Sequence, residues 1–351
     1  MTPVSFQQRW QTLMDRLIAI VTGETFSYVV KRLLQALPTL LLTSALSFFL
    51  AQLMPGDFLD QLRQNPQVSQ ETIENYRKLY GLDRPVIMQY FYWLQQIITR
   101  GDFGPSSSYA MRSTTSLIWE RVPATLLLSI SSLIVTWLIA IPLGVLGAVH
   151  QNRLIDRVLR VLSYIGQGFP TLITGLLLLF FAQMTSPLFP VGGMTSLDHA
   201  DLNGLGRLLD IGWHLILPTL ALSLTSFAGL QRITRGELLD VLRQDYIQTA
   251  RAKGLSENRV IYVHALRNAV NPLITLLGFE FGSLLGGAFI TENYFNWPGL
   301  GRLILQAVQA QDLYLVMASL MMGGVMLILG NLLADIALKF VDPRIQLSEL
   351  Q

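Results

Sequence analysis

The sequence predicts an all-α membrane protein with six transmembrane helices, and three observations predict it. Hydrophobic residues make up 51% of the chain and charged residues only 14%, whereas soluble domains carry about 25% charged residues. Six apolar runs are long enough to cross a bilayer core, which takes about 20 helical residues. Lys and Arg also gather in alternate short connections, as they do on the cytoplasmic side of membrane proteins.

The first apolar run is predicted to remain as a span. It is longer than the apolar part of a signal peptide, about 7–15 residues, and no A-x-A-like cleavage site follows it. Prolines interrupt the third and fourth runs at Pro170 and Pro218, which a bundle tolerates where neighbouring helices satisfy the freed backbone groups. The six predicted spans are residues 33–54, 122–148, 158–182, 213–231, 272–292 and 315–338.

The distribution of Lys and Arg predicts that both ends of the chain are cytoplasmic. The chain then divides into a cytoplasmic N-terminal segment (1–32), the first span (33–54), an outer loop region (55–121), a transmembrane core (122–338) and a cytoplasmic tail (339–351). The core contains a polar cytoplasmic loop at 232–271. We expect a multi-pass protein of the inner or plasma membrane.

The outer loop region is predicted to be partly helical. Ser69 is a suitable N-cap for one helix, which stops at Gly81, and Pro85 suits the first turn of another. The apolar face of these helices could lie on the membrane surface or pack on the rest of the protein. That face is formed by Ile73, Tyr76 and Tyr80, then by Val86, Tyr90, Trp93 and Ile97. Three tryptophans fall near predicted outer span ends, as interfacial aromatics do: Trp119, Trp213 and Trp297.

No motif in the sequence indicates catalysis or nucleotide binding. The patterns G-x-x-x-x-G-K-[ST], H-E-x-x-H and G-x-S-x-G are absent, and there is no cysteine for zinc or thiol chemistry. A net charge of +2 does not favour nucleic-acid binding. The histidines lack metal-ligand spacing: His150, His199, His214 and His264. We expect no enzyme activity, metal or cofactor in this chain.

The polar stretch 244–272 predicts a helix–Gly–helix hairpin between two apolar runs. Gly254 can supply the left-handed residue that ends the first helix, and Ser256 can cap the second. From these residues alone, binding to anionic lipid headgroups and docking on a partner protein are both open. Residues at helical spacing define one face of each helix: Leu238, Leu242, Tyr246 and Ala250, then Val260, Val263, Arg267 and Val270.

The order TARAKG…HALRN in this hairpin resembles the cytoplasmic EAA loop of ABC-importer permeases, in the form carried by the dipeptide/oligopeptide/nickel branch. Gly254 fits the family pattern, but Gln248, Thr249 and Ala250 stand where the general pattern has Glu-Ala-Ala. Other blocks resemble the branch in the same order, over about residues 28–346: RLLQALPTLLLTSALSFFLAQLMPGD, YGLDRPVIMQYFYWLQQIITRGDFGPS, LIWERVPATLLLS, TENYFNWPGLGRLILQAVQAQD and NLLADIALKFVDPRI.

The resemblance implies a type I ABC importer permease fold and a subunit that forms half of the pathway for peptides or a similar small solute. It implies a second, homologous permease subunit, two ABC ATPase subunits that bind ATP and Mg²⁺, and an extracytoplasmic substrate-binding protein. The hairpin would dock on an ATPase, with Arg251 and Lys253 as candidates for charged contacts. The implied docking residues are Asp245, Tyr246, Gln248, Thr249, Ala250, Arg251, Ala252, Lys253, Gly254, Leu255, Ser256, His264, Arg267 and Asn268.

Three residues of the fifth span are candidates for the translocation pathway: Glu280, Gly282 and Gly286. A carboxylate within a span indicates function, although Glu280 could instead be solvated or paired near the cytoplasmic end. The glycines, with Gly278, form a small-x-x-x-small pattern whose first interpretation is close helix packing.

Two further patterns predict local structure. Asn331 and Asp335 are four residues apart on the last span and predict a hydrogen-bonded pair rather than a substrate contact. NWPGLG at 296–301 predicts a rigid turn first and a contact for the binding protein second. Two other functions compete with the permease. A stand-alone channel or secondary carrier is the alternative, against which no repeated half is found. An intramembrane enzyme would need a nucleophile–base pair or a metal cluster, and neither is present.

Overall fold

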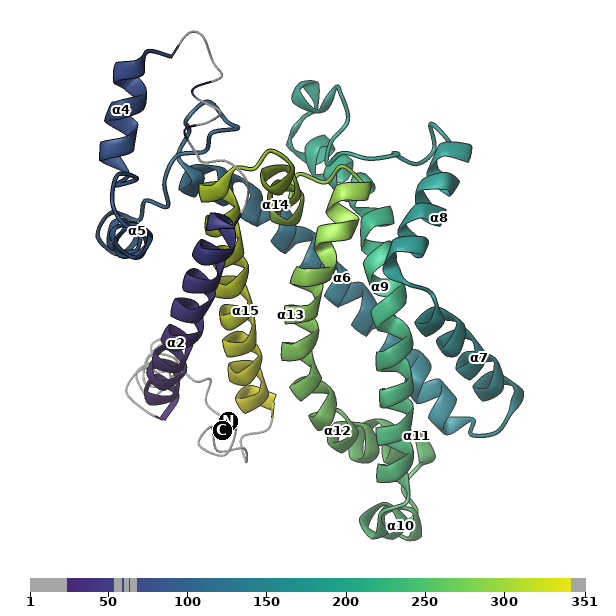
Figure 1. Ribbon diagram of the computed structural model, residues 1–351. Helices are drawn as coiled ribbons and strands as arrows, with labels where there is room; N and C mark the ends of the chain where they lie inside the picture. Colours follow the sequence, from purple (N-terminus) through teal and green to yellow (C-terminus); the bar gives the residue numbers. More distant parts are fainter. Residues whose placement is uncertain (1–23, 54–58, 60–62, 64–67, 342–351) are drawn as a thin grey trace, which may run out of the picture.

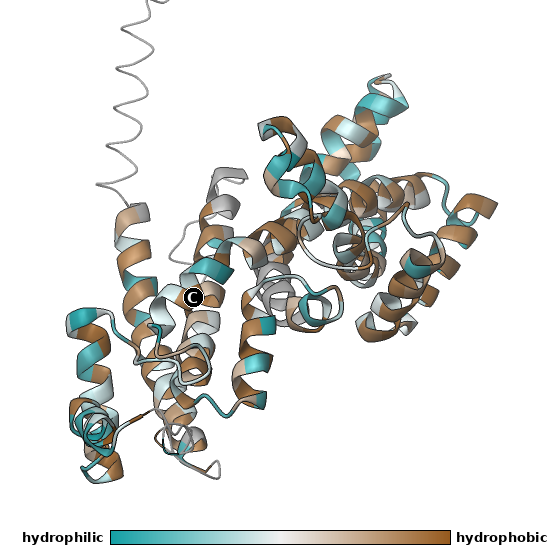
Figure 2. Ribbon diagram, turned by 90° about the horizontal axis from the view of Figure 1, so that it is seen from above, coloured by the Kyte–Doolittle hydropathy of each residue, from teal (hydrophilic) through white to brown (hydrophobic). Residues whose placement is uncertain are grey.

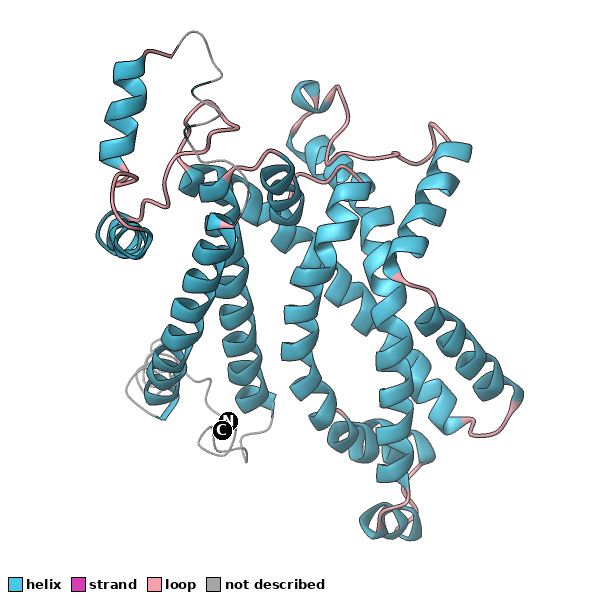
Figure 3. Cartoon of the chain, viewed as in Figure 1, coloured by secondary structure: helices cyan, strands magenta, loops and turns pink. Residues whose placement is uncertain are grey.

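The computed structural model describes residues 24–53, 59, 63 and 68–341. Side chains at 24–25, 51, 275, 278–287, 334 and 337–341 also lie outside the description. Most of the predicted N-terminal segment, part of the outer loop region and most of the predicted tail therefore fall outside it. Across the described part of the chain the regular elements are helices (Figure 3), joined by loops that contain one isolated bridge between Pro105 and Ser113.

The helices follow one another as Figure 1 labels them, with long helices through the middle and short ones at the two ends. In chain order they are α2 (Glu24–Gln52), α4 (Gln70–Leu79), α5 (Val86–Arg100), α6 (Thr114–Val149), α7 (Leu154–Gly168), α8 (Thr171–Met184), the 3₁₀ turn η1 (His199–Asp201), α9 (Gly204–Leu242), α10 (Asp245–Ala252), α11 (Glu257–Arg259), the π-helical turn η2 (Val260–Ala265), α12 (Leu266–Ala269), α13 (Asn271–Tyr294), α14 (Leu300–Gln309) and α15 (Leu313–Val341).

Length and composition identify four membrane-crossing helices in the described ranges, and a fifth span if a bent pair is counted as one. The four are α2, α6, α9 and α15, and the pair is α7 with α8. The predicted fifth span, 272–292, lies in α13, whose side chains at 278–287 are among those not described. The count of six spans therefore stays a prediction.

The predicted third span, 158–182, is wrong as a single continuous helix. α7 and α8 meet at an angle of 98°, and the break is formed by Phe169 and Pro170. Phe169 has extended backbone angles and Pro170 precedes the first turn of α8. A residue before proline is driven out of the helical region, so the apolar run continues through the break although the helix does not.

The central contact of the bundle is between α6 and α9, which approach closely at Gly144. A Cβ atom placed on Gly144 would lie 2.6 Å from Cβ of Thr234 and 2.9 Å from the backbone oxygen of Gln231. Real Cβ atoms almost never come so close, so only glycine fits this position without a shift of one helix. Small residues at contacts of this kind let membrane helices pack closely.

The outer helices α4 and α5 pack on the rest of the protein. Ser69 caps α4, because its hydroxyl accepts a hydrogen bond from the Thr72 amide at 3.1 Å, as predicted. Tyr90 and Trp93 of α5 are buried against Phe48 of α2 and against α15, and the Tyr90 hydroxyl is 2.9 Å from the Ser44 hydroxyl. Of the two alternatives for this apolar face, packing on the protein is therefore confirmed. Val86, also assigned to it, is exposed.

Large apolar side chains remain exposed on the long helices. Seen from above in Figure 2, hydrophobic positions extend over the outer sides of the bundle. An exposed apolar surface of this extent is unusual for a soluble monomer and is expected where lipid surrounds the helices. Examples on α2 and α8 are Leu34, Leu42, Leu46, Leu177, Phe180 and Met184.

Candidate functional site

The predicted hairpin is formed by α10 and the short helices α11, η2 and α12, and Figure 1 places it at one end of the bundle. Gly254 ends α10 with a positive φ of 75°. Its amide donates to the Arg251 carbonyl at 2.9 Å, and the Leu255 amide donates to the Ala250 carbonyl at 3.4 Å. These two bonds are the Schellman pattern of a glycine-terminated helix. The prediction for Gly254 is confirmed, and the tip turns where the sequence indicated.

The faces predicted for the two hairpin helices are wrong in detail. α9 ends at Leu242 and α10 starts at Asp245, so the first helix is not continuous. This break rotates Ile247 into the core in place of Tyr246, which is exposed. In the second helix a π-helical turn widens the spiral. Val263 is consequently exposed.

A compact apolar core holds the hairpin against the C-terminal ends of α6 and α9. Leu238 of α9 and Ile247 of α10 have no exposed surface. The complete core consists of Val145, Ala148, Leu238, Ile247, Ala250, Val260, Ile261, Ala265 and Ala269. Because two long helices contribute to this core, the hairpin is fixed to the bundle rather than suspended from it by its ends.

Most of the predicted docking residues lie on the solvent side of this core. Ala250 is the buried exception, and Arg251, Leu255 and His264 are half-buried. The exposed members are Asp245, Tyr246, Gln248, Thr249, Ala252, Lys253, Gly254, Ser256, Arg267 and Asn268. Asn268 also donates a hydrogen bond to the Tyr246 hydroxyl at 2.8 Å, which joins the two arms of the hairpin. The site is a polar, preformed surface of the kind that a partner groove could receive.

Arg251, proposed above for a charged contact, already has a partner in the hairpin. Its Nη2 and Nε lie 2.7 Å and 3.2 Å from the two carboxylate oxygens of Glu257. The pair spans the Gly254 turn and holds its two sides together. The Arg251 hydrogen bonds keep the pKa of the Glu257 carboxyl below its usual value, although partial burial opposes this. Sequence reasoning missed Glu257, which lies three residues after the glycine.

The Arg251–Glu257 pair is expected to stabilise the turn only slightly and only above acidic pH. Exposed pairs contribute about 0.2–1 kcal/mol. Since the Glu257 pKa is lowered on folding, this contribution is complete above the unfolded-state pKa, about 4.3, and is lost as the pH falls through the folded-state value. The difference in unfolding temperature between the wild type and Glu257→Gln should therefore be small at pH 7 and should disappear in acid. A difference that grew on acidification would contradict this assignment.

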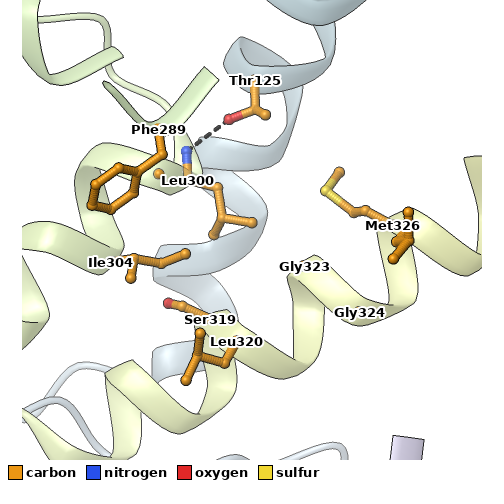
Figure 4. Close-up of a pocket in the computed structure, with 11 residues that line it drawn as sticks. Thr125, Phe289, Leu300, Ile304, Ser319, Leu320, Gly323, Gly324 and Met326 are labelled. Carbon is orange, nitrogen blue, oxygen red and sulfur yellow. Dashed lines mark hydrogen bonds between the residues drawn. The ribbon is translucent and has the colours of Figure 1, made fainter. Parts of the chain in front are cut away.

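The pathway candidates Glu280, Gly282 and Gly286 are in the middle of α13, where the side chains lie outside the described residues. A cavity of about 420 Å³ adjoins this helix nearer its outer end (Figure 4). Its lining is largely apolar. The buried Ser319 hydroxyl on it has no hydrogen-bond partner among the described residues. The described lining residues include Thr125, Phe289, Leu300, Ile304, Ser319, Leu320 and Met326.

Two buried carboxylates that sequence reasoning missed join segments around the C-terminal end of α13 and around α14. Glu292 accepts hydrogen bonds from the Thr125 hydroxyl at 2.6 Å and from the Arg302 amide at 3.1 Å, at the start of α14. Asp312 accepts from the Ser106 hydroxyl at 2.5 Å and from the Leu315 amide at 3.2 Å. The two carboxylates therefore join segments that are distant in sequence, Thr125 with Glu292 and Ser106 with Asp312.

The NWPGLG segment is a turn, in which the Trp297 amide donates to the Glu292 carbonyl and the Gly299 amide to the Trp297 carbonyl, both at 2.8 Å. The prediction of Trp297 as an interfacial aromatic is wrong. Its side chain is fully buried, and its indole Nε1 donates to the Ala124 carbonyl at 2.9 Å. Trp119 and Trp213 are exposed, in line with the prediction. The adjacent Pro and Gly could have indicated that Trp297 is buried, because a tryptophan within a Pro-Gly turn holds the turn only where its side chain is packed.

The predicted pairing of Asp335 with Asn331 is also wrong. Asp335 instead accepts hydrogen bonds from the Tyr28 hydroxyl at 2.8 Å and from Arg32 Nε at 3.2 Å, both on α2. A carboxylate on a span gains more from a cation on a neighbouring helix than from an amide one turn away.

Two histidines, His199 in η1 and His214 in α9, contact one carboxylate. His199 Nδ1 lies 2.6 Å from Asp210 Oδ2, and His214 Nδ1 lies 3.2 Å from Asp210 Oδ1. The Ser196 amide donates to the same carboxylate. Within the described ranges no group of three or more His, Asp or Glu side chains is placed to hold a metal ion. These side chains fasten the 185–203 connection to the start of α9.

Comparison with known proteins agrees with this arrangement. Residues 140–347, more than half of the chain, match the family "Binding-protein-dependent transport system inner membrane component". Residues 25–129 match the family "Binding-prot-dependent transport system membrane comp, N-term".

The chain is 40% identical to the oligopeptide transport system permease protein AppB of Bacillus subtilis, over 91% of this chain and 99% of that protein. It is 37% identical to a putative peptide permease protein of Brucella suis, over 92% and 99%. It is 36% identical to the glutathione transport system permease protein GsiC of Salmonella choleraesuis, over 91% and 99%.

The sequence had left two functions open, an ABC-importer permease and a stand-alone channel or carrier. These matches favour the permease over the stand-alone protein. Binding-protein-dependent systems operate with ATPase and substrate-binding partners. The chain belongs to the family of binding-protein-dependent transport system inner membrane components, and it is a multi-pass permease subunit of an ABC importer in the peptide and oligopeptide branch.

Proposed function

We propose that this permease forms half of the pathway of a peptide importer, with a second, homologous permease subunit as the other half. Six spans cross the membrane, namely α2, α6, the bent pair α7–α8, α9, α13 and α15, and both termini are cytoplasmic. A substrate-binding protein delivers peptides or a similar small solute from outside. Two ATPase subunits bind ATP and Mg²⁺, so this chain holds no cofactor of its own.

The hairpin from α10 to α12 is the element that docks on an ATPase in this proposal. The observation that carries it is the combination of an exposed polar surface with a rigid base. Its tip is closed by the Schellman pattern at Gly254, and its core is shared with α6 and α9. A force applied at the tip would therefore be passed to two long helices and would not be lost in loop flexing.

Replacing Gly254 by valine tests the docking. A β-branched residue at φ 75° is strained by roughly 1–2 kcal/mol, so the tip should rearrange and the variant should lose most of the ATPase that co-purifies with the wild-type complex. Membrane insertion should be unchanged.

Gly193→Val is the matched control. Gly193 also has a positive φ, 87°, and lies in the 185–203 connection, which is assigned to the outside. The same strain there should leave ATPase association intact. Equal losses in both variants, or none in Gly254→Val, would overturn the docking assignment.

A further inference from the structure

A buried carboxylate on α7, Asp156, has no role in the docking surface and is bound by α9. It has no exposed surface. The Arg235 guanidinium binds both of its oxygens, with Nε at 2.6 Å from Oδ1 and Nη2 at 2.9 Å from Oδ2. The Asn152 amide donates to Oδ2 at 2.8 Å. A two-point guanidinium–carboxylate contact fixes orientation as well as distance.

Two further hydrogen bonds attach α7 to α9. The buried Ser163 hydroxyl donates to the Gln231 side chain, and Arg232 donates to the Gln167 side chain at 2.8 Å. These contacts and the Asp156–Arg235 pair cover nearly the whole length of α7. α7 is consequently held to α9 from its first turn to its last.

The inner end of α9 is shared between α7 and the hairpin. Arg235 binds α7, and Leu238, one turn further on, is fully buried in the hairpin core beside Ile247. α9 runs without a break to Leu242. The hairpin, the inner part of α9 and α7 are thus joined by buried contacts.

The helical backbone of this unit is interrupted between α7 and α8, although α8 also contacts α9 through the Thr171 and Thr225 hydroxyls at 3.2 Å and through Ala182, which is buried in one cluster with residues of α9. α7 and α8 meet at 98°, and between Gly168 and Thr171 the helical hydrogen-bond ladder is absent. Because no helical hydrogen bonds have to break there, the angle between two rigid helices can change most easily at such a position.

We propose that the Asp156–Arg235 pair is a positioning element that makes α7 move as one body with the hairpin, so that hairpin movement reaches the membrane through α7 and is absorbed at the 169–170 break. This inference rests on the docking function proposed above. The alternative is that the pair only stabilises the fold, as many buried pairs do. Coupling of α7 to the hairpin is established only when two arrangements of these helices are observed directly.

Spin-label distances in the complete transporter complex supply that observation. The chain has no cysteine, so labels can be placed at exposed positions: Asn258 in the hairpin, Leu162 on α7 and Phe180 on α8. In the wild type, trapping ATP should leave the Asn258–Leu162 distance unchanged and should shift the Asn258–Phe180 distance. In Asp156→Asn the Asn258–Leu162 distribution should broaden, because α7 is no longer held at its inner end.

Arg235→Lys is the second variant, since it keeps the charge and removes the two-point contact. It should broaden the same distribution even if Asp156→Asn fails to fold. Asp210→Asn is the matched control, because it removes a nearly buried carboxylate at the other end of α9. It should leave the distribution as in the wild type.

Two outcomes would overturn the positioning role. One is a wild-type Asn258–Leu162 distance that shifts with ATP as much as Asn258–Phe180 does. The other is a wild-type distribution retained in the Asp156 or Arg235 variant. If ATP shifts neither distance in the wild type, the 169–170 break does not absorb hairpin movement, whereas the docking function is tested separately by the ATPase that co-purifies with Gly254→Val. The positioning role is then decided by the nucleotide-free distributions of the wild type and the variants.

Discussion

Replacing Gly144 by alanine is expected to lower the unfolding temperature of the protein in detergent. The added Cβ would lie 2.6 Å from Cβ of Thr234 and 2.9 Å from the Gln231 backbone oxygen, so α6 and α9 would have to separate. Overpacking of this kind costs about 1–3 kcal/mol. The loss should be visible in thermal unfolding monitored by circular dichroism.

The matched control is Gly229→Ala, on α9. A Cβ at Gly229 meets no heavy atom within 4 Å, and alanine favours a helix interior over glycine by about 0.5–1 kcal/mol. This variant should unfold at the wild-type temperature or slightly above it. If both alanines shifted the unfolding temperature equally, close contact at Gly144 would not be the cause.

Replacing Glu292 by alanine should destabilise the outer end of the bundle more strongly. The change leaves the Thr125 hydroxyl proton and the Arg302 amide without the acceptor they use, at about 1–3 kcal/mol for each buried group. It also removes the carboxylate from the N-terminus of α14, where negative charge is favourable. We expect a lower unfolding temperature and faster proteolysis between residues 296 and 302.

Glu120→Ala is the corresponding control, because Glu120 is an exposed carboxylate paired with Arg112. Removing it should change the unfolding temperature little, since exposed pairs contribute about 0.2–1 kcal/mol. Unchanged proteolysis of 296–302 in Glu292→Ala would show that the carboxylate does not hold the turn.

Sequence reasoning succeeded where the determining contacts are local. Ser69 caps a helix through a residue three positions away, and Gly254 ends one through its own backbone angle, so both can be predicted from a short window. The family resemblance likewise rests on local blocks, and it named the correct branch of permeases.

Sequence reasoning failed where a side chain finds its partner far along the chain. Asp156 and Arg235 are 79 positions apart, and Trp297 donates to a carbonyl 173 positions away. Apolar runs and helical spacing treat each segment alone, so Trp297 was assigned to the interface from its position near a predicted span end, and Asp156 was passed over. Helical spacing alone was also used for the hairpin. It placed Tyr246 rather than Ile247 in the hairpin core, because a break of two residues between α9 and α10 shifts the pattern.

The attachment of α2 to α15 bears on how the protein is made. The hydrogen bond from Tyr28 to Asp335 joins residues 307 positions apart. Ribosomes add about 5–20 residues per second, so roughly 15–60 s separate the synthesis of the two partners. During that interval α2 is already in the membrane with Arg32 lacking its carboxylate. Assembly of the bundle is therefore completed by α15, and a nascent chain that stops before it would hold an inserted α2 packed on α5, with Tyr28 and Arg32 still lacking their carboxylate.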